Sequence, residues 1–196
     1  MMAAWYLSEQ MEVTLFEKEK MPGRKFLLAG KGGFNLTNRI SGEELASKYT
    51  PSGFLNEALS QFDSLRFREW LRSLGIPTFE GSSGRVFPEK GISPAQVLGK
   101  ITASLKARGV QTFLKHKLES FNENMEFTFL SPLGKLTLHA DYVVLALGGA
   151  SWPSTGSDGK WVEMFSEQNL QTLKFEPSNC GVNIKWPDPV KQYHAG

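Results

Sequence analysis

The chain has 196 residues, 40% of them hydrophobic and 21% charged, and a formal net charge of +2. This charge is too small to predict a nucleic-acid or membrane partner from bulk electrostatics, and the longest apolar runs are too short to span a bilayer. The first ten residues carry no basic side chain, which is not typical of a signal peptide. The single Cys180 excludes an internal disulfide and fits a reducing compartment, so we expect a cytoplasmic protein.

Residues 1 to 75 show helical and strand patterns in alternation. A helix is expected at the N-terminus, with one face formed by Met2, Ala3, Tyr6 and Leu7. "EVTLFEK" then predicts a short strand that ends at Glu17. Asp63 is a suitable N-cap for a helix that ends before Gly75. Its apolar stripe comprises Phe67, Trp70, Leu71 and Leu74.

The next segment predicts one helix followed by short strands. The helix begins at Pro94 and ends at Gly109. Its apolar face comprises Val97, Leu98, Ile101 and Leu105. Strand-like pieces follow at 110–114, 125–130 and 136–139, the last two on either side of the turn sequence "SPLGK". We therefore expect an antiparallel meander at about residues 110–140.

The apolar run "YVVLAL", residues 142–147, predicts a strand that is buried on both faces. Such a strand belongs in the middle of a parallel sheet, so the whole pattern predicts a doubly wound α/β fold with a mostly parallel sheet. We expect a domain over 1–174, which includes a helical segment at about 42–75. Pro, Asn and Gly become frequent from residue 175, so 175–196 is expected to begin a second domain.

Glycine-rich loops are the main candidates for ligand binding. "GRKFLLAGKGGFNLTN", residues 23–38, holds four glycines and three cations and no acidic residue. Its backbone amides could meet a phosphate or a flavin ring, but the pattern fits a surface loop equally well. Neither a P-loop nor a GxGxxG motif occurs. An acidic residue at the end of a strand, such as Glu17, can form hydrogen bonds to a ribose or can simply be exposed to water.

Three longer motifs carry a family resemblance. "MPGRKFLLAGKGGFNLTN", "GSSGRVFPEK" and "ALGGASWPSTGSDG" resemble the bacterial NAD(P)/FAD-dependent oxidoreductases, the aminoacetone oxidase-like flavoproteins with a branch that reduces dehydro-bile acids. The resemblance extends from Met2 to about Trp186. It implies a two-dinucleotide-type flavoprotein fold with non-covalent FAD, and NAD(P)H as the electron donor.

The resemblance also implies a set of cofactor-binding residues. Glu17 would hold the adenosine ribose, Arg24 and Lys25 would lie by the pyrophosphate, and Arg85 would lie near the substrate side of the flavin. The full set is Glu17, Lys18, Arg24, Lys25, Gly30, Lys31, Gly33, Asn35, Thr37, Arg85, Lys117, Leu118, Ala146, Gly148 and Gly149. No side chain is identified as a catalytic acid or base. The three histidines and Cys180 are not spaced as metal ligands, so no metal site is expected.

Family members begin with a strand and a glycine-rich phosphate loop and are about twice as long, so the chain resembles an incomplete copy. The sequence is compatible with three functions. The first is a flavin-dependent oxidoreductase with a small-molecule substrate and no nucleic-acid partner. The second is a non-catalytic fragment that binds FAD weakly or not at all, because the phosphate loop supplies amides for the pyrophosphate. The third, a flavoprotein that modifies tRNA, has least support because the chain has no basic stripe.

Overall fold

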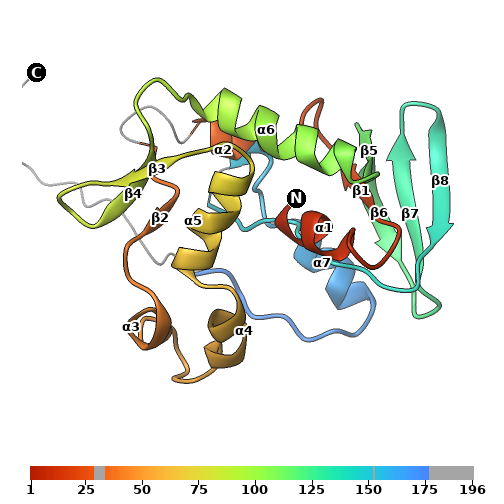
Figure 1. Ribbon diagram of the computed structural model, residues 1–196. Helices are drawn as coiled ribbons and strands as arrows, with labels where there is room; N and C mark the ends of the chain where they lie inside the picture. The colour runs from red at the N-terminus through yellow and green to blue at the C-terminus, as the bar shows by residue number, and fades with distance from the viewer. Residues whose placement is uncertain (29–33, 152, 177–196) are drawn as a thin grey trace, which may run out of the picture. The chain divides into compact units, whose positions relative to one another are not determined.

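The computed structural model describes residues 1–28, 34–151 and 153–176 (Figure 1). The chain forms two compact units, residues 1–144 and 145–196. Within the described residues, no helix has both the length and the apolar character needed to cross a bilayer.

The first unit contains a two-stranded parallel sheet. Strand β1 (Thr14–Glu17) pairs with β5 (Gln111–Leu114), with Thr14 opposite Gln111 and Glu17 opposite Leu114. The strand expected within "EVTLFEK" is therefore confirmed, with its carboxyl end at Glu17. The piece expected at 110–114 belongs to this parallel pair and not to the meander, because it follows a crossover helix rather than a hairpin.

Helices α5 (Ser64–Ser73) and α6 (Pro94–Ala107) form the core of the first unit as predicted. Asp63 caps α5 by accepting hydrogen bonds from the backbone N–H groups of Leu65 and Arg66, both at 3.0 Å. Every residue of the predicted α6 face is buried, and so are two residues of the α5 stripe. These buried residues are Val97, Leu98, Ile101, Leu105, Trp70 and Leu71.

The N-terminal helix α1 (Met2–Leu7) packs through a face other than the predicted one. Ala4 is buried, and Met1 and Trp5 join the core, whereas Met2 and Tyr6 are exposed. The prediction of a face with Met2 and Tyr6 was wrong because Trp5, the largest apolar group, determines the side that is buried. Its indole Nε1 donates to Ser104 Oγ at 2.9 Å, and the Arg108 guanidinium carbon lies 3.8 Å from the Trp5 ring centroid.

Two antiparallel sheets complete the first unit (Figure 1). One has the order β2-β4-β3, formed by β2 (Thr37–Asn38), β3 (Thr78–Glu80) and β4 (Arg85–Pro88). The other is the expected meander, formed by β6 (Lys117–Phe121), β7 (Glu126–Ser131) and β8 (Gly134–His139). Its β6 strand was not predicted. The short helices α2 (Arg24–Leu28), α3 (Gly42–Ala46) and α4 (Asn56–Gln61) connect these parts.

The predicted central strand at residues 142–147 is not formed. Tyr142 is 80% exposed and Val144 is 59% exposed. A strand that is apolar on both faces needs a neighbour at each edge, and within the described residues the parallel sheet consists only of β1 and β5. Residues 142–147 are therefore apolar in sequence but form neither a helix nor a strand.

The second unit contains one 3-10 turn, η2 (Pro153–Thr155), and one helix, α7 (Trp161–Glu167), among its described residues. Neither was predicted. Trp161 of α7 packs edge-on against Phe165 and Phe175, with ring centroids 5.0 and 5.7 Å away. Most of the expected second domain, 175–196, lies outside the described residues, so its boundary stays a prediction.

Candidate functional site

Glu17 lies at the carboxyl end of β1, the position at which open α/β sheets bind ligands. Its carbonyl oxygen accepts a hydrogen bond from the backbone N–H of His116 at 2.9 Å. Its carboxylate Oε1 accepts from the backbone N–H of Glu19, also at 2.9 Å. The carboxylate is thereby held in one orientation while the side chain stays only half-buried. Its second oxygen is suited to accept a hydrogen bond from a hydroxyl group of a ligand.

Lys117 and Leu118 lie at the same edge of the sheet as Glu17, because the preceding residue, His116, donates its backbone N–H to the Glu17 carbonyl oxygen. They begin β6 directly after His116, whose ring centroid is 5.8 Å from that of Phe16 on β1. The His116 Nδ1 atom also lies 2.8 Å from the carbonyl oxygen of Leu114. These contacts fix the short turn between β5 and β6. Predicted site residues that are 100 positions apart in the sequence are thus neighbours in the fold.

Arg24 extends the same group of residues toward α2. Its Nη1 atom lies 3.4 Å from Glu19 Oε2, and Glu19 is the residue whose N–H group orients the Glu17 carboxylate. Both partners of the ion pair keep substantial exposure, 48% for Arg24 and 31% for Glu19. An exposed pair of this kind contributes about 0–1 kcal/mol, so a phosphate could take over the guanidinium at small cost. Lys18 and Lys25, which follow Glu17 and Arg24 in the sequence, are also exposed.

These residues fit one end of a dinucleotide. A fixed carboxylate at a strand end suits ribose hydroxyls, and an exposed arginine near it suits a pyrophosphate. The residues expected to continue toward the flavin, Gly30, Lys31 and Gly33, lie outside the described residues. The described part of the predicted site is therefore the adenosine side, formed by Glu17, Arg24 and the start of β6, and its role in binding stays a prediction.

Three further predicted residues lie around the β2-β4-β3 sheet. Asn35 is exposed just before β2, and Thr37 lies in β2 opposite Val86. Arg85 begins β4 opposite Asn38, and its side chain is exposed. These residues therefore lie in or beside one sheet, but alternation along the strands places Thr37 and Arg85 on opposite faces.

Ala146, Gly148 and Gly149 belong to the second unit. Gly148 has a φ of +81°, which a residue with a side chain rarely adopts, and its carbonyl oxygen accepts from Trp161 Nε1 at 2.8 Å. The Ser157 side chain is buried close to Gly148. The glycine therefore shapes a turn that Trp161 fixes. The proposed crossing of this turn over a cofactor stays a prediction.

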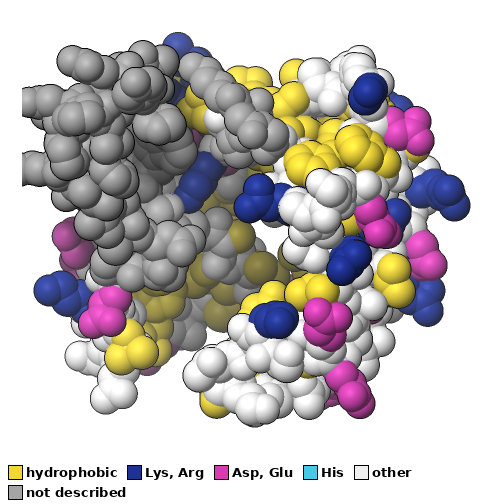
Figure 2. All heavy atoms as spheres, turned by 90° about the vertical axis from the view of Figure 1, so that its left-hand side faces the viewer, with side chains coloured by type: hydrophobic (Ala, Val, Ile, Leu, Met, Phe, Trp, Pro, Cys, Tyr) yellow, Lys and Arg dark blue, Asp and Glu magenta, His cyan; other side chains and the backbone are white. Residues whose placement is uncertain are grey.

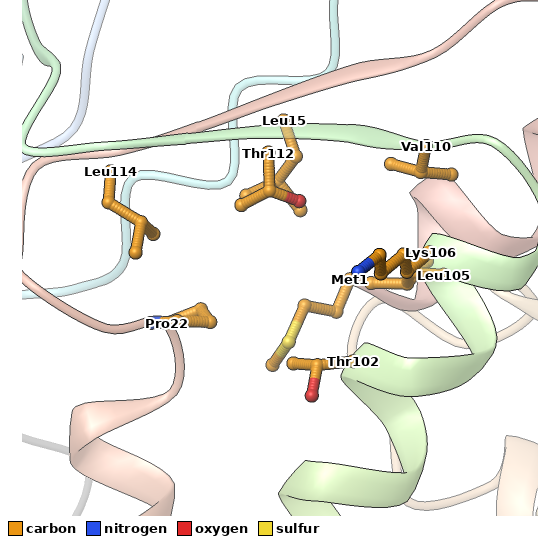
Figure 3. A pocket seen from close by; sticks show the side chains of 9 residues that line it. All are labelled: Met1, Leu15, Pro22, Thr102, Leu105, Lys106, Val110, Thr112 and Leu114. Carbon is orange, nitrogen blue, oxygen red and sulfur yellow. The ribbon is translucent and has the colours of Figure 1, made fainter.

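A cavity of about 480 Å³ lies between α6 and one face of the β1–β5 sheet (Figure 3). It is lined by Leu15 of β1, by Thr112 and Leu114 of β5 with Val110 just before that strand, by Thr102, Leu105 and Lys106 of α6, and by Met1 and Pro22. Burial lowers the pKa of the Met1 α-amino group. Of the predicted cofactor residues that the structure describes, none lines this cavity. The sequence signal for it is the alternation along β1 and β5, which sequence reasoning used only to predict strands.

Charge and metal-binding potential are modest across the described residues. Figure 2 shows one side of the molecule, where Lys and Arg side chains are interspersed with acidic and apolar ones. No group of three or more His, Cys, Asp or Glu side chains that could hold a metal ion occurs in the part of the chain that the structure describes.

Comparison with known proteins identifies what the chain is similar to. The family model described as the HI0933-like protein Rossmann domain matches residues 1–189. The chain is 28% identical over 170 residues to a ribosomal RNA dihydrouridine synthase of Escherichia coli, covering 87% of this chain and 41% of that protein. It is also 28% identical over 148 residues to a 3-dehydro-bile acid delta(4,6)-reductase of Clostridium scindens, covering 76% of this chain and 35% of that protein.

A solved structure supports the fold. A 3-ketosteroid-delta4-(5alpha)-dehydrogenase from Rhodococcus jostii matches with a TM-score of 0.54 and 13% identity, over 75% of this chain and 43% of that one. This likeness is evidence for the FAD-binding Rossmann-like fold alone. The chain spans about two fifths of the length of the curated relatives that it matches.

Proposed function

The chain belongs to the HI0933-like family of FAD-dependent Rossmann domains, and on this premise we propose that it is the adenosine-binding part of a flavin-dependent oxidoreductase. The observation that carries the proposal is the position of Glu17. Its oriented carboxylate closes a parallel strand beside Arg24 and the start of β6. This arrangement matches the hydrogen-bonding needs of an adenosine diphosphate group.

The roles of this chain's residues are binding and orientation. Bound FAD would supply the hydride transfer, since the flavin carries the redox chemistry in such enzymes. Glu17 would accept hydrogen bonds from the ribose hydroxyls, and its bond from the Glu19 N–H group keeps the carboxylate in place. Arg24, which forms an ion pair with Glu19 at 3.4 Å, would bind the pyrophosphate instead. Lys117 and Leu118, the first two residues of strand β6, would border the adenine.

We propose that the reaction is the reduction of a carbon–carbon double bond, with NAD(P)H as the electron donor. The names of the Escherichia coli and Clostridium scindens relatives, a dihydrouridine synthase and a delta(4,6)-reductase, support this reaction class. The single Cys180 supports a cytoplasmic location.

A second candidate is a non-catalytic chain that binds only nucleotides. The exposed apolar run at residues 142–147 favours this second candidate. Without a strand at these residues, part of the ligand-binding edge of the sheet is missing. The two candidates share the adenosine site and differ in turnover. Reduction of FAD by NADH or NADPH, followed at the flavin absorbance, distinguishes them.

The test of the adenosine site is a titration with FAD followed by flavin fluorescence. Glu17→Gln should weaken binding about tenfold, since a hydrogen bond to a charged group contributes roughly 1.5–3 kcal/mol. Glu43→Gln, an exposed acid on α3, is the matched control and should leave binding unchanged. ADP should compete with FAD, whereas FMN, which lacks the adenosine, should not. If Glu17→Gln binds FAD as tightly as the parent chain, the proposed site is wrong.

A further inference from the structure

The cavity between α6 and the β1–β5 sheet has the dimensions of a ligand site (Figure 3). Its volume of about 480 Å³ falls within the usual range of small-molecule sites, about 300–1,000 Å³. Because none of the described cofactor-binding residues lines it, the adenosine site leaves this cavity unassigned. Its ligand must therefore be inferred from the lining residues.

Most of the cavity wall is apolar. Leu15 of β1 and Leu114 of β5 line it from the sheet, and Leu105 lines it from α6. Leu105 keeps only 3% of its surface exposed and Val110 only 6%, so this part of the wall lies deep in the first unit. Water finds few polar partners beside such side chains, whereas an alkyl group that replaces it gains from burial of apolar surface. The wall therefore favours an aliphatic ligand.

The polar side chains of the lining are Thr102, Lys106 and Thr112, and none of them is acidic. Lys106 and Thr112 are exposed, and within the described residues neither side chain has an ion pair or a hydrogen bond. Thr102 Oγ1, by contrast, donates to the carbonyl oxygens of Leu98 and Gly99, both at 3.0 Å. The ammonium group of Lys106 and the hydroxyl group of Thr112 are therefore the donors that a ligand can use.

The last turn of α6 does not depend on the Lys106 ammonium group. The N–H groups of Arg108 and Val110 both donate to the Leu105 carbonyl oxygen at 3.1 Å, and the Gly109 N–H group donates to the Lys106 carbonyl oxygen at 3.0 Å. These carbonyl groups are thus satisfied by the backbone. Figure 3 shows the Lys106 side chain directed from α6 toward the space between helix and sheet. Its charge is available to an anion there.

We propose that this cavity binds a medium-chain aliphatic carboxylate, with its alkyl chain along Leu15, Leu105 and Leu114 and its head group at Lys106 and Thr112. A carboxylate accepts hydrogen bonds from an ammonium and from a hydroxyl group, and its single charge matches one lysine. A phosphate monoester carries a charge of about −1.5 to −2 and meets no second cationic side chain in the lining. The inference does not rest on the proposed function, because it concerns a separate site.

The experiment is isothermal titration calorimetry of the chain as given with hexanoate, octanoate and decanoate. One decanoate should bind per chain with a Kd below about 1 mM. Affinity should rise about fourfold for each added CH₂ group, because each one buries further apolar surface. Decylamine has the same chain length but would place an ammonium group beside Lys106, so it should bind at least about tenfold more weakly than decanoate.

Two pairs of variants test the head-group site and the cavity separately. Lys106→Gln should weaken decanoate binding about tenfold, whereas Lys90→Gln, which removes an exposed lysine outside the cavity, should bind like wild type. Thr112→Phe should fill the cavity and prevent binding. Gln111→Phe is its control, since alternation along β5 places Gln111 on the other face of the sheet. Circular dichroism spectra like that of wild type show that each variant is folded.

Three results would overturn the proposal. They are no binding of decanoate up to about 1 mM, equal affinities for decanoate and decylamine, and equal effects within either pair of variants. The titration contains no FAD and measures no turnover. Normal FAD binding together with no decanoate binding therefore rejects this inference alone.

Discussion

Leu71 and Leu65 occupy the same helix, α5, in opposite environments. Leu71 has no exposed surface, whereas Leu65 is 49% exposed. Leu71→Ala should therefore lower the free energy of unfolding by about 2–5 kcal/mol, because it leaves a cavity in the core. Leu65→Ala is the matched control and should stay within about 1 kcal/mol of the parent. Urea unfolding followed by circular dichroism measures both, and a Leu71→Ala effect as small as that of Leu65→Ala would contradict the assigned core.

A substitution of Arg24 tests the proposed pyrophosphate contact at the candidate site. Arg24→Ala should weaken FAD binding at low salt, and the difference from wild type should shrink as salt rises and screens the charge. Arg66→Ala is the control, since Arg66 forms a comparable exposed ion pair with Glu69 on α5. The measurement is the FAD titration at two ionic strengths. A defect in Arg24→Ala that does not change with salt would show that the guanidinium does not contact the pyrophosphate.

The contribution of the α6 capping box to stability can be tested by a substitution of Ser93. Ser93 Oγ accepts from the Gln96 N–H group at 3.3 Å, and Gln96 Oε1 accepts from the Ser93 N–H group at 2.8 Å. Ser93→Ala should therefore cost about 1 kcal/mol of stability. Ser82→Ala, in the exposed turn between β3 and β4, should cost almost nothing. Equal midpoints of thermal unfolding for the two variants would argue against the cap.

The elements that sequence reasoning predicted well are those specified by neighbouring residues. Asp63 and Pro94 mark helix starts, and the face of α6 from Val97 to Leu105 follows from a period of 3.6 residues. The meander turn at "SPLGK" is equally local, and Ser131 pairs with Gly134 as expected.

The elements that were mispredicted depend on distant partners. Residues 142–147 have the composition of a buried strand, yet a strand forms only by pairing. The pairing of β5 with β1 and the stacking of Phe79 on Phe87 likewise require residues that local patterns do not connect. At the candidate site, the resemblance named Glu17 and Leu118. The bond from the Glu19 N–H group that orients the carboxylate became visible only in three dimensions.

On the scale of the molecule, the exposed run at 142–147 should govern self-association. Tyr142, Val143 and Val144 are 80%, 43% and 59% exposed and adjacent in sequence. Apolar segments of this kind with no charge promote strand-to-strand association. Val144→Lys should therefore reduce the apparent mass measured by light scattering at increasing protein concentration. Leu133→Lys is the control, since Leu133 is fully exposed but isolated in a turn. Identical behaviour of the two variants would exclude the run as the contact.

The contacts of α1 and β1 with α6 and β5 also determine when the molecule can be completed during synthesis. Trp5 bonds to Ser104, and Arg108 to Glu9, each across 99 positions of the chain. The turns of the meander, by contrast, close within a few residues and form in about 1–10 µs. Strand β1 must wait, unpaired, until β5 has left the ribosome, because distant contacts form only after the intervening loop is closed. A nascent chain that ends before residue 111 therefore has no complete Glu17 edge to offer to a nucleotide.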